Sequence, residues 1–233
     1  MSTVYLVPCV LAEDAIESIP AYVMDAVKKC QVIFAENERT ARRFLKSMDK
    51  TIVIDDYEWF AIHKAEEEQV LQIKLKIKEG KDIAVISEAG CPGIADPGQI
   101  LIAAAQQMNA VIKPLVGPSS ILLALMASGM NGQQFEFVGY LAIDTHERNK
   151  KIQELEASSR KNNSTKIFIE TPYRNNQLFD SLIKNCTGTT KLCIGVNITA
   201  VNESIRTHTI TEWKNKKPEL HKQPAIFLLY SGN

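Results

Sequence analysis

The sequence predicts an α/β protein of two domains, and three observations lead to this fold class. Short β-branched runs alternate with helical patterns through the first half of the chain, which is typical of a parallel sheet. Later strand-like runs follow one another with fewer helices between them, which indicates a mixed or antiparallel sheet. A length of 233 residues, 45% of them hydrophobic, is enough for one large domain or two small ones. We therefore expect an N-terminal α/β domain over residues 1–116 with a mostly parallel sheet, and a C-terminal α+β domain over residues 117–233 with a mixed sheet.

The first domain is predicted from five β-branched runs that end in turn-forming residues. The expected strands are Val4–Val7, Val32–Ala35, Thr51–Ile54, Ile83–Ser87 and Val111–Leu115. A helix is expected over Gln99–Met108 in this domain. Another is expected at the start of the second domain, over Ile121–Ser128, with a serine cap before it and Gly129 just past its end.

The second domain begins with an apolar run over Phe135–Tyr140 and a polar connection. Asp144 and Glu147 form a capping pair for a charged helix that runs to about Arg160. The remaining expected elements are a strand over Lys166–Ile169, a helix over Gln177–Lys184, and strands over Leu192–Ile198, Ser204–Ile210 and Ala225–Tyr230.

Glycine and proline are concentrated in two loops that follow predicted strands. The first 79 residues contain no glycine, whereas four of the eleven glycines and four of the nine prolines lie between Glu88 and Pro118. Glycine lets backbone N–H groups face a ligand, and proline fixes the loop shape. The helix start at Gly117–Ser120 offers free N–H groups for an anion. These loops favour a site for a polar small molecule, with ordinary tight turns as the alternative.

The composition and the absence of certain motifs argue against several classes of protein. Lysine plus arginine and aspartate plus glutamate are equal at 27 each, so any polyanion site must be local. No glycine-rich turn follows the first strand and no GxxxxGK[ST] occurs, which disfavours Rossmann dinucleotide enzymes and P-loop NTPases. The five cysteines are odd in number without a CxxC pair, and the chain has no basic leader and no long apolar span. We expect a cytoplasmic protein with reduced thiols, no metal site and no membrane segment.

Four segments, in order, carry a family resemblance: AENERTARRFL at 35–45, SEAGCPGIADPG at 87–98, GPSSILLALMASGM at 117–130 and FIETPYR at 168–174. They resemble the tetrapyrrole methylase-like class of S-adenosylmethionine-dependent methyltransferases. Within that class they are most similar to the branch that methylates a cytidine ribose 2′-hydroxyl in small-subunit ribosomal RNA. The resemblance implies two α/β domains with the cofactor, S-adenosylmethionine, in the cleft between them, usually in a homodimer and without a metal.

The resemblance also implies which residues contact the cofactor. They come from the end of the first strand, the two glycine-containing loops and the start of the last strand. The implied cofactor residues are Pro8, Ser87, Glu88, Ala89, Gly90, Gly93, Ile94, Gly117, Ser119, Ser120, Ile121, Pro224 and Ala225.

The sequence departs from the ribosomal RNA branch where the acceptor would be recognised. The proline-isoleucine-glycine-asparagine element after the first strand is replaced at Val7–Asp14, and the acidic-Asp-Thr-Arg motif has become Glu36–Arg39. The tyrosine-histidine-glutamate-histidine-asparagine element of the branch is replaced by Asp56–Phe60, and its Lys-x-His-Glu stretch by Ala200–Glu203. The chain ends at Asn233 without the extension common in the branch. We interpret the chain as a shortened, divergent paralogue whose cofactor side is intact.

Methyl transfer needs alignment and desolvation more than covalent catalysis, so a catalytic residue can be inconspicuous. Candidates to accept a hydroxyl proton are Glu36, Glu38 and Glu170, with a surface role as the alternative for each. The candidate RNA-binding residues recur at helical spacing beside the first two carboxylates: Arg39, Arg42, Arg43 and Lys46.

Other polar and aromatic residues have two interpretations each. The basic stretches Arg148–Lys151 and Lys214–Lys217 are candidates for the same RNA-binding role, or solvated surface. Trp59 and Phe60 fit core packing better than stacking on a base. The four histidines show no pairing that indicates metal or nucleophilic chemistry.

Three functions remain open from the sequence. The first is a methyltransferase acting on RNA, with ribosomal RNA as the acceptor that the branch resemblance implies. The second is a methyltransferase for a tetrapyrrole or another small acceptor. The third is an inactive paralogue that only binds the cofactor.

Overall fold

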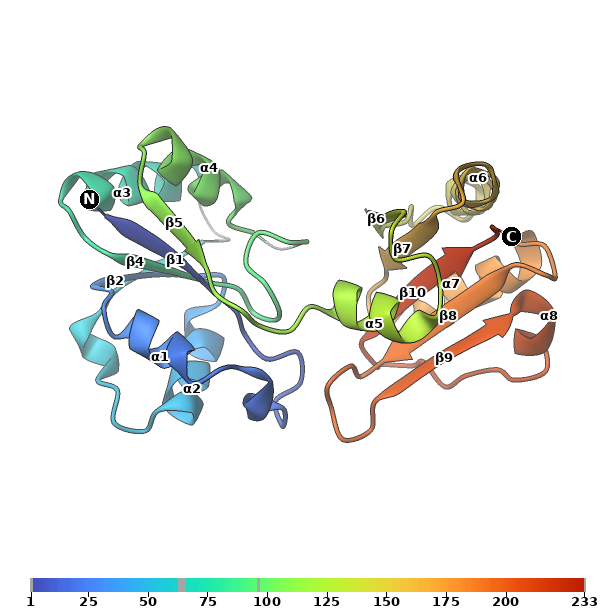
Figure 1. The fold of residues 1–233 in the computed structure, drawn as a ribbon, viewed down its shortest axis with the longest axis horizontal. Coiled ribbons are helices and arrows are strands. Elements are labelled where there is room, and N and C mark those ends of the chain that lie inside the picture. Colours follow the sequence, from blue (N-terminus) through green and yellow to red (C-terminus); the bar gives the residue numbers. More distant parts are fainter. Residues whose placement is uncertain (1, 63–65, 96, 233) are drawn as a thin grey trace. The chain divides into compact units, whose positions relative to one another are not determined.

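The computed structural model describes residues 2–62, 66–95 and 97–232. The chain divides into two compact units, Met1–Ser119 and Ser120–Asn233, each with its own sheet and helices (Figure 1). The expected domain boundary at 116 lies three residues before this division.

The first unit contains a five-stranded sheet whose neighbouring strands pair in parallel. The strand order is β3-β2-β4-β1-β5. The strands are β1 (Thr3–Val7), β2 (Val32–Ala35), β3 (Glu58–Ala61), β4 (Ile83–Ile86) and β5 (Val111–Pro114). The helices are α1 (Tyr22–Val27), α2 (Glu38–Met48), α3 (Glu66–Lys78) and α4 (Gln99–Gln107), and short 3-10 turns lie at Ile16–Ser18 and Ile54–Asp56. The mostly parallel N-terminal sheet is therefore confirmed.

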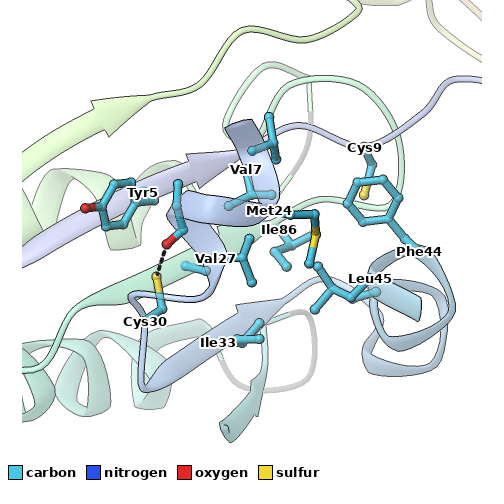
Figure 2. Packing of buried hydrophobic residues seen from close by; sticks show 14 of the residues in the cluster. Tyr5, Val7, Cys9, Met24, Val27, Cys30, Ile33, Phe44, Leu45 and Ile86 are labelled. Atoms are coloured by element: carbon cyan, nitrogen blue, oxygen red, sulfur yellow. Dashed lines mark hydrogen bonds between the residues drawn. The ribbon is translucent and has the colours of Figure 1, made fainter. Parts of the chain in front are cut away.

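Helices cover both faces of this sheet. On one face, Met24 and Val27 of α1 and Phe44 and Leu45 of α2 pack against the inward side chains of β1, β2 and β4 (Figure 2). On the other face, Ile73 of α3 and a group of α4 residues complete a second buried cluster. A doubly covered sheet explains why its central strands read as continuous apolar runs.

The third strand was predicted at the wrong place. The run Thr51–Ile54 forms no strand, because the Asp49 carboxylate accepts hydrogen bonds from both the backbone N–H (2.8 Å) and the hydroxyl (2.7 Å) of Thr51. This local bond competes with a sheet ladder. The strand is instead β3, whose Phe60 ring stacks on Phe34 of β2 with centroids 4.8 Å apart. Contact with a distant strand decides the position, and local propensity does not.

The second unit contains a five-stranded mixed sheet in the order β6-β7-β10-β8-β9. The strands are β6 (Phe135–Tyr140), β7 (Thr165–Ile169), β8 (Lys191–Val196), β9 (Ser204–Thr209) and β10 (Ala225–Tyr230). β6 is parallel to β7, and the other pairs are antiparallel, so the predicted mixed sheet is confirmed. The helices are α5 (Ser120–Ser128), α6 (Thr145–Asn162), α7 (Asn175–Asn185) and α8 (Ile210–Trp213).

Two capping interactions set the helix starts in this unit. The Asp144 carboxylate accepts the backbone N–H of Glu147 at 2.9 Å, which confirms the expected start of α6. Thr209 and Glu212 form a reciprocal capping box at the start of α8, so β9 ends at Thr209, one residue before the predicted end. Helices α6, α7 and α8 contribute to the main buried cluster of the unit, and α5 packs against β8, β9 and β10.

Candidate active site

The carboxyl ends of β1 and β4 are neighbours in the first unit, with Val7 paired to Ile86. The helices that follow these two strands pack on opposite faces of the sheet, α1 on one and α4 on the other. Ligands of open α/β sheets bind outside strand carboxyl ends at such a reversal of direction. The fold therefore puts the candidate site where the loops after β1 and β4 leave the sheet.

The two loops are joined by backbone hydrogen bonds. The N–H of Cys9 donates to the carbonyl of Gly90 at 2.9 Å, and the N–H of Gly90 donates back to the carbonyl of Cys9 at 3.1 Å. The loop after β5 joins them, because the Cys91 thiol donates to the Pro118 carbonyl at 3.5 Å. Three loops thus meet at this edge.

Gly117 is required by a close approach to Pro8. A Cβ atom at position 117 would lie 2.2 Å from the Pro8 Cβ, well inside van der Waals contact. Pro8 is buried, and the backbone N–H of Val116 is fixed by the Tyr22 hydroxyl at 2.7 Å. The glycine lets the β5 loop lie directly against the end of β1.

Glu36 fastens a fourth loop to the same site. Its Oε2 atom accepts the backbone N–H of Glu88 at 2.8 Å, and the Thr40 hydroxyl donates to the Glu88 carboxylate at 3.4 Å. The Asn37 side chain caps the first turn of α2 by accepting the backbone N–H groups of Arg39 and Thr40. Glu36 therefore holds the glycine-rich loop in place.

The structure brings the expected cofactor residues of the first unit together. Ser87 is buried, and its hydroxyl donates to the carbonyl of Ala89 at 3.3 Å. Gly93 adopts a φ of +77°, and Ile94 beside it is 54% exposed. Glu88 and Ala89 are exposed, Gly90 is buried, and Ser119 is half-buried. Asp96, within the expected loop, lies outside the described residues.

Four expected cofactor residues belong to the second unit. Ser120 and Ile121 open α5. Pro224 and Ala225 stand at the start of β10, where the Pro224 carbonyl accepts the N–H of Asn197 at 3.0 Å.

The candidate proton acceptors are all engaged by other groups. Glu36 accepts the Glu88 N–H, and Glu38 pairs with Arg42 at 2.9 Å. Glu170 is buried in the second unit, where it accepts the Arg174 guanidinium at 2.6 Å. Hydrogen bonding to Glu170 raises the pKa of Arg174 above its ordinary value. These contacts favour positioning roles for the three carboxylates.

The basic residues expected to bind RNA separate into two groups. Arg39 and Arg43 are exposed on α2, and neither has an ion pair within the described residues. Arg42 is instead held by Glu38 and lies 4.8 Å above the Trp59 ring. The expectation of a surface role was wrong for Arg148, which is 5% exposed and donates to the Ser181 hydroxyl at 3.1 Å.

Trp59 and Phe60 take the packing role. The Trp59 indole donates to the Ile54 carbonyl at 3.0 Å and packs against the buried cluster beneath α1 and α2. Phe60 stacks on Phe34. The lysine run near the C-terminus is surface, since Lys217 pairs with Asp180 at 3.2 Å and both side chains are more than 60% exposed.

Of the residues that connect the loops, sequence reasoning named Glu36, Glu88 and Gly90 but missed Cys9, and it predicted none of their contacts. Cys9 contacts Gly90 and Glu36 contacts Glu88 across separations that no local pattern reveals. Their positions after predicted strands could have indicated these contacts. Each of these residues lies within a few positions of the end of a strand, and the ends of parallel strands meet at one edge of the sheet.

The described part of the chain offers neither a metal centre nor a membrane-spanning helix. In residues 2–62, 66–95 and 97–232, no three His, Cys, Asp or Glu side chains gather closely enough to hold a metal ion. No described helix has both the length and the apolar character needed to cross a membrane. His63 lies outside the described residues.

Comparison with known proteins agrees with this geometry. Over residues 14–214 the sequence matches the family model of Tetrapyrrole (Corrin/Porphyrin) Methylases. It is 28% identical over 230 residues to the ribosomal RNA small subunit methyltransferase I of Vibrio cholerae, covering 97% of this chain and 76% of that protein. Identity to the protein of the same name from Bacillus subtilis is 29% over 220 residues, covering 93% and 71%.

Solved structures show the same fold at low identity. The methyltransferase CobJ matches with a TM-score of 0.65 and 15% identity, over 98% of this chain and 93% of that one. Uroporphyrin-III-C-methyltransferase from Thermus thermophilus matches with a TM-score of 0.57 and 15% identity, over 99% and 92%. With a family match across most of its length, and with loops that converge where this fold binds ligands, the chain belongs to the tetrapyrrole (corrin/porphyrin) methylases.

Proposed function

We propose that this protein is an S-adenosylmethionine-dependent methyltransferase that acts on small-subunit ribosomal RNA. The observation that carries the proposal is the convergence of the loops after β1, β4 and β5, fastened by the Cys9–Gly90 bridge and the Pro8–Gly117 contact. The relatives named as small-subunit ribosomal RNA methyltransferases match most of the chain and supply the choice of acceptor.

The loops fit the proposed cofactor. Gly117 lets the loop after β5 lie against Pro8, and the loop from Ser87 to Ile94 presents backbone groups with three exposed residues, Glu88, Ala89 and Ile94. A carboxylate or hydroxyl of a ligand can bond to such backbone groups, and the exposed Ile94 side chain offers apolar surface to a flat ring. When bound, S-adenosylmethionine supplies an electrophilic methyl group on a positively charged sulfur.

The protein's own contribution is alignment. Glu36 and Thr40 fix the loop after β4, and the Cys9–Gly90 bridge ties that loop to β1, so the loop shape is set before a ligand arrives. Holding two reactants in line and excluding water supplies much of the rate of a displacement reaction. We propose a ribose 2′-hydroxyl as the acceptor. Glu36 contacts the loop backbone directly, and it is the carboxylate whose two roles, positioning the loop and accepting the proton, substitution can separate.

Arg39 and Arg43 are the proposed phosphate contacts. They are one turn apart on the exposed side of α2, the helix that begins beside Glu36. Residues four apart lie on one helix face, so the two guanidinium groups can bind neighbouring phosphates of a backbone.

The test is calorimetric titration with S-adenosylmethionine, followed by transfer of a labelled methyl group. Acceptors are small ribosomal subunits, purified small-subunit rRNA and a tetrapyrrole. Cofactor binding with label in the rRNA supports the proposal. Label in the tetrapyrrole alone, or no cofactor binding, would overturn it.

A further inference from the structure

A hollow of about 480 Å³ lies in the second unit between β6 and α6. Its volume falls within the range of small-molecule sites, roughly 300–1,000 Å³. One wall comes from the end of β6 and the residues after it, and the other from α6; both elements are labelled in Figure 1. The lining residues are Val138, Tyr140, Leu141, Ala142, Glu147, Lys150, Lys151 and Glu154.

The strand wall presents an aromatic ring through an irregularity in β6. Pairing with β7 shifts between Phe137 and Gly139, and Gly139 adopts a φ of +78°, which other residues rarely adopt. A bulge of this kind re-aims the side chains beside it. Tyr140, the next residue, is 59% exposed, whereas Leu141 after it is buried and anchors the turn.

The helix wall carries charges on a single face. Glu147, Lys150, Lys151 and Glu154 follow the i, i+3, i+4, i+7 spacing of one helix side, while Ile152 and its neighbours on the opposite side are buried. Lys151 lies 3.8 Å from Glu154, a loose ion pair between exposed groups. No carboxylate of the described chain lies within ion-pair distance of Lys150, so its ammonium is available to an anion.

A ligand for this hollow needs a flat π-face for Tyr140, an anion for Lys150 and N–H donors for the two glutamates. An unpaired nucleotide has all three, since its base stacks on aromatic rings and carries amino or imino groups, and its phosphate pairs with lysine. We propose that the hollow between β6 and α6 binds one unpaired nucleotide of the RNA substrate, with the base on Tyr140 and the phosphate at Lys150. The choice of RNA as ligand rests on the proposed function.

The experiment measures binding of a fluorescently labelled, unstructured oligoribonucleotide to the full chain by anisotropy, over a series of salt concentrations. Tyr140→Ala should weaken binding about 5- to 150-fold, because stacking of one base is worth roughly 1–3 kcal/mol by alanine substitution. Tyr140→Phe keeps the ring and should restore affinity. Lys150→Gln should lower the slope of log affinity against log salt by about 0.7, because one phosphate is no longer neutralised.

Matched controls come from the same elements outside the hollow. Phe135→Ala removes an exposed aromatic ring from the other end of β6, and Lys161→Gln removes an exposed charge from the far end of α6. Both should bind RNA like the wild type. Equally weakened binding in the controls, wild-type affinity in Tyr140→Ala, or no binding by the wild type would each overturn the proposal.

Methyl transfer is measured separately on the same variants. Transfer to rRNA by the wild type, combined with RNA affinity that ignores Tyr140 and Lys150, refutes the nucleotide site and leaves the proposed function standing. Oligonucleotide binding that depends on Tyr140, without methyl transfer to any acceptor, refutes the proposed function and supports the site.

Discussion

Glu36, at the end of β2, accepts a 2.8 Å hydrogen bond from the backbone N–H of Glu88, in the loop after β4. The Glu36 side chain thus fixes a loop 52 residues away in the sequence. A carboxylate in this position can have two roles, support of the loop and acceptance of a proton, and they respond differently to substitution.

Replacing Glu36 distinguishes these roles. Glu36→Ala removes the acceptor of the Glu88 N–H and should weaken S-adenosylmethionine binding about tenfold, the usual cost of a missing charged hydrogen bond. Glu36→Gln keeps an acceptor oxygen and should keep most of the affinity and the methyl transfer rate. Calorimetry and labelled-methyl transfer are the measurements. Intact affinity with abolished transfer in Glu36→Gln would instead identify Glu36 as the proton acceptor.

Gly117 should tolerate no side chain. Gly117→Val puts branched carbon atoms where a Cβ alone would lie 2.2 Å from Pro8, so the loop after β5 must move away from β1. We expect cofactor affinity to fall at least about tenfold while circular dichroism stays that of a folded protein. Gly132→Ala is the control, since nothing lies within 4 Å of a Cβ at that position. Wild-type affinity in a folded Gly117→Val would remove the β5 loop from the site.

The two exposed arginines of α2, Arg39 and Arg43, should contribute to RNA affinity, whereas Arg42 should contribute to the stability of the fold. The double variant Arg39→Gln with Arg43→Gln should lower the slope of log RNA affinity against log salt by about 0.7 for each phosphate that is no longer bound. Cofactor affinity should not change. Arg42→Ala removes the stacking on Trp59 and the pairing with Glu38, so it should lower the melting temperature. Arg206→Gln, an exposed arginine on β9, serves as the charge control. An unchanged salt slope in the double variant would place the phosphate contacts on another surface.

Cysteine reactivity should report on the loop after β4. Burial, with a smaller effect of Asp82, raises the pKa of the Cys30 thiol to about 12, and burial also raises the pKa of Cys193. Because the pKa in the folded protein lies above the ordinary value, both thiols stay neutral and should resist alkylation between about pH 7 and pH 9.

Cys91, by contrast, is half-buried in the loop after β4 and should react with the alkylating reagent, more slowly when S-adenosylmethionine is present. Peptide mass spectrometry after timed alkylation gives the rates, and a Cys91 rate that the cofactor leaves unchanged would contradict the proposed site.

Local patterns were sufficient for most elements of the fold. The cap at Asp144 and the apolar runs of β1, β2, β4 and β10 depend on residues close in sequence, so the sequence alone located them. Thr51–Ile54 failed because Asp49 captures Thr51 locally while Phe60 finds its partner Phe34 on another strand. That second contact is tertiary, and no window of sequence contains it.

The candidate site residues likewise include some that the local sequence identified and some that it did not. The glycine loops were visible because backbone conformations that need glycine leave a mark in composition. The basic stretch at Arg148–Lys151 looked uniform, yet Arg148 is buried and bonded to Ser181 while Lys150 is exposed. Arg148 and Lys150 differ only in the direction in which each side chain leaves α6. That direction matters because one face of the helix is buried, and the sequence alone does not show which face.

The hydrogen bonds between Cys9 and Gly90 restrict the motion of the loops after β1 and β4. Two backbone hydrogen bonds, of 2.9 and 3.1 Å, extend the pairing of β1 and β4 into the loops that follow them. Amides protected in this way exchange with solvent on the timescale of the sheet, whereas free loop amides exchange much faster. A ligand that meets so ordered a loop gives up little chain entropy on binding, and more of its contact energy remains as affinity.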